Sequence, residues 1–142
     1  MNRALLFLAA LLLSACVSKE PKPQATCFHR DAAIEKDIGF CQAVRSGNTL
    51  HVSGVTGAGN MDAAVRSVYD QLKQILEANG LSPSDVVKET VFATDLDAFI
   101  ENRAIRKEFY GQTLPAASWV QVQRLYLPSF VVEVELTAQY PN

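Results

Sequence analysis

The alternation of apolar and polar residues is the clearest pattern in the C-terminal part of the chain. Two runs between residues 114 and 138 alternate with a period of two, and a short link around Pro128 separates them. Alternation of this kind predicts two strands, each with one apolar face. Because the link is short, we expect the two strands to pair with each other in antiparallel fashion. The opposite face of the expected pair mixes aromatic, amide and acidic side chains, namely Trp119, Gln121, Gln123, Glu133 and Glu135.

The rest of the pattern predicts a layered α+β domain. Residues 40–45 and 49–53 are strand-like runs around Ser46-Gly47-Asn48, a sequence typical of a hairpin. Apolar residues recur every three or four positions in residues 61–79, and residues 96–109 lie between a capping aspartate and Gly111, so both segments predict helices. Residues 86–94 are rich in β-branched side chains and predict a strand. The order β-β-α-β-α-β-β predicts one sheet with both helices on one face.

Residues 1–16 are typical of a bacterial lipoprotein signal peptide. A positive start is followed by an apolar run of about ten residues, too short to span a bilayer as a finished helix. The run ends in Leu13-Ser14-Ala15-Cys16, which resembles a lipobox and predicts a lipid on Cys16 after cleavage. An uncleaved anchor or a plain secretory signal is the alternative. By resemblance to lipoprotein sorting signals, Val17 after the cysteine, where aspartate is absent, favours the outer membrane over the inner, on the periplasmic side.

Residues 17–37 are expected to form a flexible tether to a domain at residues 38–142, because the tether begins polar and rich in proline. A periplasmic location permits a disulfide between Cys27 and Cys41. Two free thiols are the alternative, since the sequence does not show whether the Cα atoms come within reach. We expect no metal site, because neither cysteine has a CxxC partner and neither is expected to sit in a cluster with His29 or His51.

Three segments resemble the RidA/YjgF family. They are Gln42-Ala43-Val44 with its following Ser-Gly, the run from Gly80 to Phe99, and Pro115-Ala-Ala-Ser-Trp-Val with the later Val-Glu-Val-Glu. The resemblance implies a chorismate-mutase-like fold with a mixed sheet, closed into a homotrimeric barrel with ligand pockets between subunits. It also implies hydrolysis of small imines and enamines, such as 2-iminobutanoate and 2-iminopropanoate, without a metal or organic cofactor.

The same resemblance locates candidate site residues, and several depart from the family pattern. Ala117 stands where deaminating members carry the arginine that binds the substrate carboxylate, and alanine cannot form that contact. Phe40 replaces a tyrosine, and Arg103 replaces an asparagine. Ser118 is retained, and Glu133 is retained as the candidate catalytic carboxylate.

Other side chains near these positions have two interpretations each. Arg124 or Arg103 could replace the missing cation, although both are also typical surface arginines. Trp119 could stack on a ligand or pack in the protein. Glu133 and Glu135 could form an acid–base pair or line a subunit interface.

Three functions follow from these observations. The first is a membrane-tethered, divergent family member that binds a small molecule at clefts between subunits. The second is an imine deaminase with an altered substrate, and the third is a chaperone-like holdase. RNA, which the family's older endoribonuclease label suggests, is disfavoured by the net charge of −2 and the lack of a basic stripe.

Overall fold

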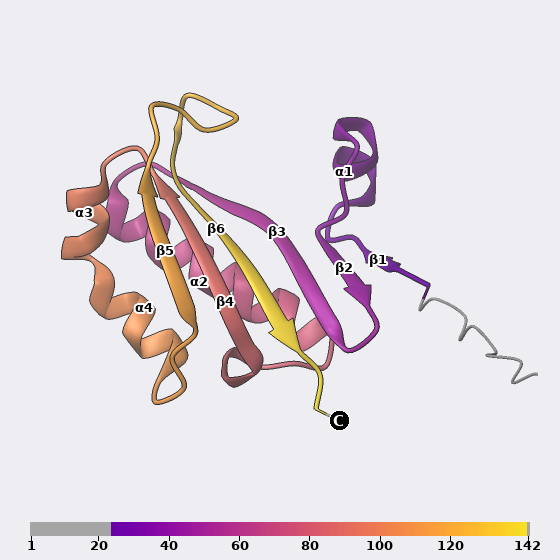
Figure 1. Ribbon diagram of the computed structural model, residues 1–142. Coiled ribbons are helices and arrows are strands. Elements are labelled where there is room, and N and C mark those ends of the chain that lie inside the picture. The colour runs from indigo at the N-terminus through magenta and orange to yellow at the C-terminus, as the bar shows by residue number, and fades with distance from the viewer. Residues whose placement is uncertain (1–23, 142) are drawn as a thin grey trace, which may run out of the picture.

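The computed structural model describes residues 24–141, which form one sheet and a helical layer (Figure 1). The strands are β1 (Thr26–Phe28), β2 (Ala43–Ser46), β3 (Thr49–Ala58), β4 (Val86–Ala93), β5 (Ala116–Gln121) and β6 (Phe130–Gln139). The helices are α1 (Ala32–Ile38), α2 (Met61–Ala78), α3 (Leu96–Glu101) and α4 (Arg103–Tyr110), with a short 3-10 turn, η1 (Pro83–Asp85).

The strand order is β1-β2-β3-β6-β4-β5, and only the β4–β5 pair within this sheet is parallel. Helices α2, α3 and α4 cover one face, with α3 and α4 near the β5 edge and α1 beyond β2 at the other edge (Figure 1). The predicted α+β class, with one mixed sheet and its helices on one face, is confirmed.

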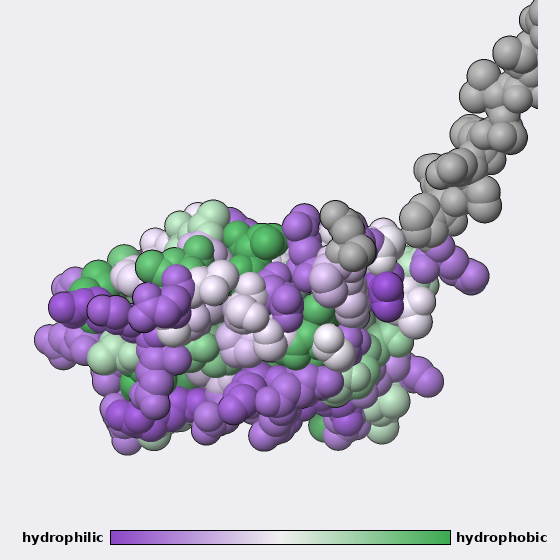
Figure 2. Space-filling model, turned by 90° about the horizontal axis from the view of Figure 1, so that it is seen from below, coloured by the Kyte–Doolittle hydropathy of each residue, from purple (hydrophilic) through white to green (hydrophobic). Residues whose placement is uncertain are grey.

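Local sequence signals explain where the main helices begin and end. The Asn60 side chain accepts from the backbone N–H of Ala63 and caps α2, and Gly80 follows its end with a φ of 72°. The apolar side of α2 then packs on the sheet, so that Val68, Leu72 and Leu76 are fully buried. The end of the molecule seen in Figure 2 is mostly polar, with small apolar areas between the polar ones.

The antiparallel pairing expected between the two C-terminal strands is wrong. β6 lies between β3 and β4, and β5 pairs with β4 in parallel. The segment from β4 through α3 and α4 to β5 is therefore a β-α-β crossover, which a short link between β5 and β6 does not reveal.

Three further details of the prediction are corrected. Trp119 aligns with the buried Val91 and faces the helices, so it does not share a face with Glu133. Gln123 and Arg124 lie beyond the end of β5, in the link to β6. The helix predicted over residues 96–109 is interrupted at Asn102 and divides into α3 and α4.

The predicted boundary between tether and domain is also corrected, because folded structure begins earlier than residue 38. β1 pairs with β2, and Asp31 caps α1 through the backbone N–H groups of Ala33 and Ile34. Residues 26–37 are therefore part of the fold. The signal peptide and Cys16, together with residues 17–23 of the tether, lie outside the described residues. Among the helices of residues 24–141, none combines the length and apolar character that a membrane span requires.

Candidate functional site

The face of the sheet opposite the helices is crossed by rows of aligned side chains from neighbouring strands. The rows hold Val44, His51, Thr137, Lys88 and Ala116; then Glu135, Thr90 and Ser118; then Thr56, Glu133, Phe92 and Val120. We call this surface the open face. A groove of about 270 Å³ lies on it, with His51, Lys88 and Glu135 among its lining residues.

Glu133 and Glu135 share the open face, as predicted. Glu133 is half-buried, and burial followed by the nearby charge of Glu135 raises its pKa above the usual value. A β-bulge in β3 opposite these residues contains Gly54, and a Cβ there would lie 1.8 Å from Oε1 of Glu133. The missing side chain of Gly54 thus makes the space that the Glu133 carboxylate occupies. A carboxyl with a raised pKa can exchange a proton nearer to neutral pH.

Lys88 is a site residue that the sequence reasoning missed. Its Nζ donates to Oγ of Ser118 over 2.7 Å, from the neighbouring strand. Ala117, next to Ser118, is exposed on the other side of β5, where its register partner on β4 is Glu89. The position expected to hold the family's arginine therefore offers only the methyl group of Ala117. The ammonium of Lys88, which comes from β4, lies on the opposite face of β5.

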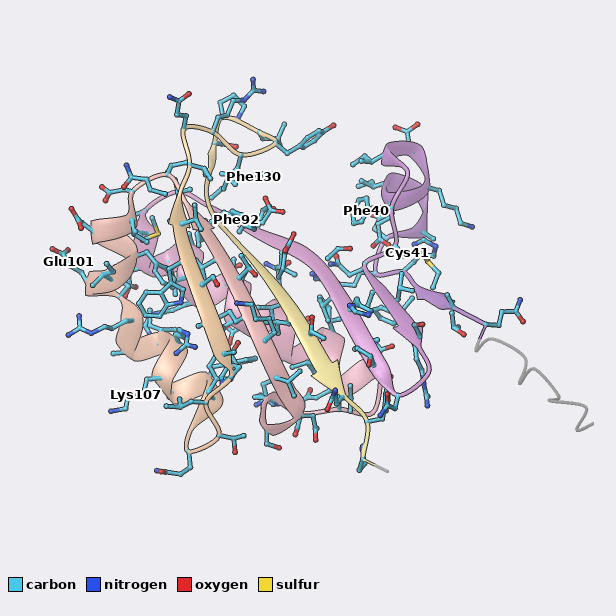
Figure 3. The ribbon with its side chains drawn as sticks, viewed as in Figure 1. Phe40, Cys41, Phe92, Glu101, Lys107 and Phe130 are labelled. Atoms are coloured by element: carbon cyan, nitrogen blue, oxygen red, sulfur yellow. A yellow bond between two sulfur atoms is a disulfide. The ribbon has the colours of Figure 1, made fainter. Side chains whose placement is uncertain are left out.

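Phe40 lies far from Ala117 in the order of the sheet. It follows α1 and precedes β2, at the edge opposite β5, and 37% of it is exposed (Figure 3). One chain therefore cannot bring these two candidates together within its own sheet.

The two candidate replacement cations are both engaged locally. Arg103 donates to the carbonyl oxygen of Ile100, and Arg124 donates to that of Tyr126. Both arginines are exposed. These contacts favour the interpretation of both residues as surface arginines.

Trp119 belongs to a buried polar cluster on the helix side, which the sequence reasoning missed. Its ring packs edge-on against Phe99 with 5.2 Å between ring centroids, and its Nε1 donates to Glu89. Glu89 is completely buried and forms an ion pair with Arg106. Trp119 is therefore a packing residue whose polar atom is satisfied inside the protein.

A larger hollow of about 460 Å³ lies between α2 and α4, away from the open face. Its walls carry both signs of charge, from Arg66, Lys73, Asp70 and Glu108. None of the candidate site residues lines it, so we place the candidate site on the open face and at the sheet edges.

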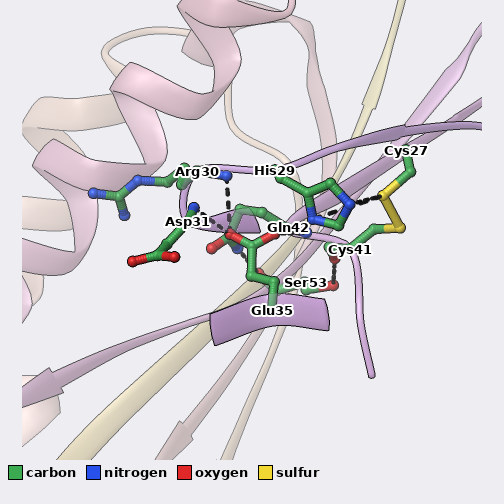
Figure 4. The surroundings of a disulfide bond; sticks show 8 residues. All are labelled: Cys27, His29, Arg30, Asp31, Glu35, Cys41, Gln42 and Ser53. Atoms are coloured by element: carbon green, nitrogen blue, oxygen red, sulfur yellow. Dashed lines mark hydrogen bonds and ion pairs between the residues drawn. A yellow bond between two sulfur atoms is a disulfide. The ribbon is translucent and has the colours of Figure 1, made fainter. Parts of the chain in front are cut away.

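Cys27 and Cys41 form a disulfide and are not free thiols. Their Cα atoms are 5.6 Å apart (Figure 4). His29 lies beside the bond, with Nε2 3.1 Å from Sγ of Cys27 and Nδ1 2.6 Å from Oε2 of Glu35. Cys27, His29 and Cys41 therefore form a group of metal-binding side chains. The expectation that His29 stands apart from the cysteines is wrong, because β1 pairing and the start of α1 bring the three together.

Comparison with known proteins identifies relatives over most of the described chain. The family model described as "Endoribonuclease L-PSP" matches residues 30–140. The 2-iminobutanoate/2-iminopropanoate deaminase of Escherichia coli K12 is 38% identical over 111 residues, which cover 70% of this chain and 85% of that protein. A RutC family protein of Pyrococcus horikoshii is 34% identical over 113 residues, covering 72% of this chain and 89% of the relative.

A solved structure has the same fold. The structure of a YjgF/YER057c/UK114 family member from Mycobacterium tuberculosis matches with a TM-score of 0.76 and 28% identity, covering 82% of this chain and 100% of the other. The family model, the sequence relatives and this structure agree with the motifs found in residues 42–44, 80–99 and 115–135. The chain belongs to the RidA/YjgF family.

Proposed function

We propose that this protein binds a small molecule in a cleft between copies of the chain and has diverged from deaminases of 2-imino acids. The separation of Phe40 from Ala117 carries the proposal. They lie at opposite ends of one sheet, so a site containing both requires the β1–β2 end of one copy to approach the β5 edge of the next. A head-to-tail contact of this kind, repeated around an axis, closes a ring. The homotrimer that the family resemblance implies is such a ring.

The exposed apolar side chains support this arrangement. Ile34, Ile38 and Phe40 are exposed near the β2 edge, and Leu114 and Val120 are exposed near the β5 edge. Large apolar side chains that remain exposed at the two ends of a sheet are typical of surfaces that another subunit covers.

The chemistry of the cleft favours a ligand without a carboxylate. Ala117 offers no charge where a carboxylate-binding arginine is expected, and Arg103 and Arg124 donate to nearby backbone carbonyls. On the open face, Glu133 and Glu135 bring two carboxyl groups against the one ammonium of Lys88. An amine or a neutral polar molecule fits these groups better than an anion does.

Lys88 supports a second candidate function, imine hydrolysis with a changed substrate. Its ammonium lies 2.7 Å from Ser118, on the strand that carries Ala117, and could bind a carboxylate that approaches from the open face. Glu133, whose pKa is raised by burial, would then position the water or transfer the proton.

We also propose that the protein is a lipoprotein anchored through Cys16 on the periplasmic side. The lipobox-like Leu13-Ser14-Ala15-Cys16 supports this, and so does the Cys27–Cys41 disulfide, since such bonds persist in oxidising compartments. Expression of the full chain with a radiolabelled fatty acid tests it. Label should appear in the wild type and be absent from Cys16→Ser, which should also leave the membrane fraction.

A deaminase assay on the full-length chain distinguishes the two candidate functions. Freshly generated 2-iminobutanoate and 2-iminopropanoate are offered to the wild type, Ala117→Arg and Lys88→Met. Ala116→Arg is the matched control, because Ala116 is exposed on β5 but lies on its other face. We expect no turnover by the wild type and a gain only in Ala117→Arg.

Turnover by the wild type that Lys88→Met abolishes would favour the altered deaminase instead. A thermal-shift screen with small amines and neutral polar compounds complements the assay. We expect stabilisation by members of this set and none by 2-oxo acids. Stabilisation by 2-oxo acids alone would contradict the proposed ligand class.

A further inference from the structure

Three side chains with metal-binding atoms converge where the N-terminal segment joins the sheet (Figure 4). Cys27 comes from β1, His29 from the link between β1 and α1, and Cys41 from the link between α1 and β2. One ligand atom of each lies within 4.8 Å of the others. Two sulfurs and an imidazole nitrogen are a ligand set that zinc prefers.

Glu35 holds the imidazole of His29 in the orientation that a metal ligand needs. Its Oε2 lies 2.6 Å from Nδ1 of His29, which leaves Nε2 directed at Sγ of Cys27. A carboxylate bonded to the far nitrogen of a metal-binding histidine is the usual outer partner in zinc sites, where it fixes the tautomer and raises the basicity of the ring.

The Glu35 carboxylate is itself fixed. Only 3% of Glu35 is exposed, and its oxygens accept from the backbone N–H groups of Arg30, Asp31 and Gln42. These contacts fix the carboxylate in the position from which Oε2 meets Nδ1 of His29.

We propose that the reduced form of this protein binds one divalent cation of the zinc type through Cys27, His29 and Cys41. A dithiol reductant supplies two electrons and two protons to the disulfide and is itself oxidised to a disulfide. The two thiols formed lose their protons to the solvent when Sγ of each binds the cation, and neutral His29 binds through Nε2.

The backbone spacing suits both states. The Cα atoms of Cys27 and Cys41 are 5.6 Å apart, and a tetrahedral zinc with bonds of about 2.3 Å to sulfur needs the sulfurs roughly 3.8 Å apart. Rotation of the two cysteine side chains supplies that opening. Because Cys27 is exposed, the fourth coordination position faces solvent and is open to water or an external ligand.

The disulfide and the cation exclude each other, since both use the same two sulfurs. The site is therefore closed under oxidising conditions and opens on reduction. It shares no residue with the open face, so it stands independently of the proposed ligand cleft.

A zinc titration of the full-length chain tests the proposal. The chain has three cysteines, so Cys16→Ser is the background that leaves only Cys27 and Cys41. Oxidised and reduced protein are titrated with zinc against a chromophoric chelator. We expect one zinc per reduced chain, none per oxidised chain, and loss of binding in Cys27→Ser and Cys41→Ser. His29→Ala should weaken binding at least tenfold, whereas His51→Ala, which changes an exposed histidine on β3, should not.

Cobalt substitution and a second variant make the result specific. Reduced protein with bound cobalt should show a thiolate-to-cobalt charge-transfer absorption band, and Cys27→Ser should remove this band. Glu35→Gln should weaken zinc binding roughly 10- to 100-fold, in the range known for outer partners. Far-UV circular dichroism follows folding in every sample. Equal zinc binding by oxidised and reduced protein, equal loss in His29→Ala and His51→Ala, or a reduced chain that is unfolded with zinc present would each overturn the proposal.

Discussion

Arg106 on α4 donates from Nε to the carboxylate of Glu89, which is completely buried in the middle of β4. Tyr69 and Tyr110 donate to the other carboxylate oxygen over 2.8 Å each. Burial and then the charge of Glu89 raise the pKa of both phenols far above the usual value, so both keep their protons. With Trp119, the cluster joins β4 to α2, α4 and β5, and it thereby fixes the strand that carries Ala117 and Ser118.

We predict that breaking this pair strongly destabilises the fold. Arg106→Met keeps much of the side-chain volume but leaves the Glu89 charge without its cation, and removing one partner of a buried pair costs about 3–5 kcal/mol. Urea unfolding measures the loss. Arg66→Met is the control, because Arg66 forms an exposed ion pair with Asp62 on α2 and should change little.

A double variant separates the unpaired charge from the lost packing. Arg106→Met with Glu89→Met should recover much of the stability, since apolar replacement of a whole buried pair is often neutral. Equal losses in the single and the double variant would mean that packing, and not the buried charge, dominates.

Gly54→Ala is predicted to move the Glu133 carboxylate without unfolding the protein. The new Cβ would lie 1.8 Å from Oε1 of Glu133, and a flexible side-chain end can rotate away. Gly57→Ala is the matched control on the same strand, because its Cβ would meet the backbone oxygen of Ala64 at 2.6 Å. We expect a large fall in melting temperature for Gly57→Ala, and for Gly54→Ala a small fall with a changed Glu133 carboxyl NMR shift. The reverse order would contradict the assignment of this space to Glu133.

The features that could be predicted are those that neighbouring residues in the sequence determine, and contacts between distant segments could not be predicted. Residues 61–78 and 86–93 were placed correctly because their spacing and the Asn60 cap are local. The partner of β5 was not, because alternation within a strand says nothing about which strand lies beside it. Trp119 was placed on the wrong face because apolar side chains stand on both faces of β5, and the face with Val120, which is 42% exposed, is not the one that meets the helices.

The cluster around Glu89 could have been predicted from the sequence, whereas the group of Cys27, His29 and Cys41 could not. Glu89 alternates in phase with Val91 and Ala93, and an acidic residue on the buried side of a strand is a signal that could have identified it. The group of Cys27, His29 and Cys41 had no such signal. Cys27 and His29 lie only two residues apart, but Cys41 joins them because β1 pairs with β2 and α1 folds back between them. The spacing of the three in the sequence therefore resembles no metal-binding motif.

The stability of the protein should respond to the charge of Glu133 in the opposite sense to most carboxylates. Its pKa is raised, so the folded state binds this proton more tightly than the unfolded state and loses stability as pH rises through the raised pKa. Glu133→Gln should therefore melt at a higher temperature than the wild type at pH 7, and this difference should vanish below about pH 4.

A carboxyl NMR titration of Glu133 in Glu135→Gln should give a lower pKa than in the wild type, because the neighbouring charge is gone. An unchanged pKa would leave burial as the only cause.

Glu35 should give the complementary pH response at the other end of the sheet. Its pKa is lowered by hydrogen bonds that prevail over burial, so its contribution to stability is present above the ordinary carboxyl pKa near 4.5 and is lost as pH falls through the folded value. Glu35→Gln should cost about 2 kcal/mol at pH 7, the scale of hydrogen bonds to a charged acceptor.

The difference between the wild type and Glu35→Gln isolates this one carboxyl from all others that titrate in acid. We expect that difference in unfolding free energy to shrink as the pH falls below the ordinary carboxyl value near 4.5. It should vanish once Glu35 is protonated in the folded state, because protonated glutamate and glutamine are then alike. Amide hydrogen exchange locates the effect. Residues of α1 should lose protection in Glu35→Gln while those of β6 keep it, because the bonds of Glu35 tie the start of α1 to Gln42. A difference that stays constant with pH would mean that the charge of Glu35 does not stabilise this segment.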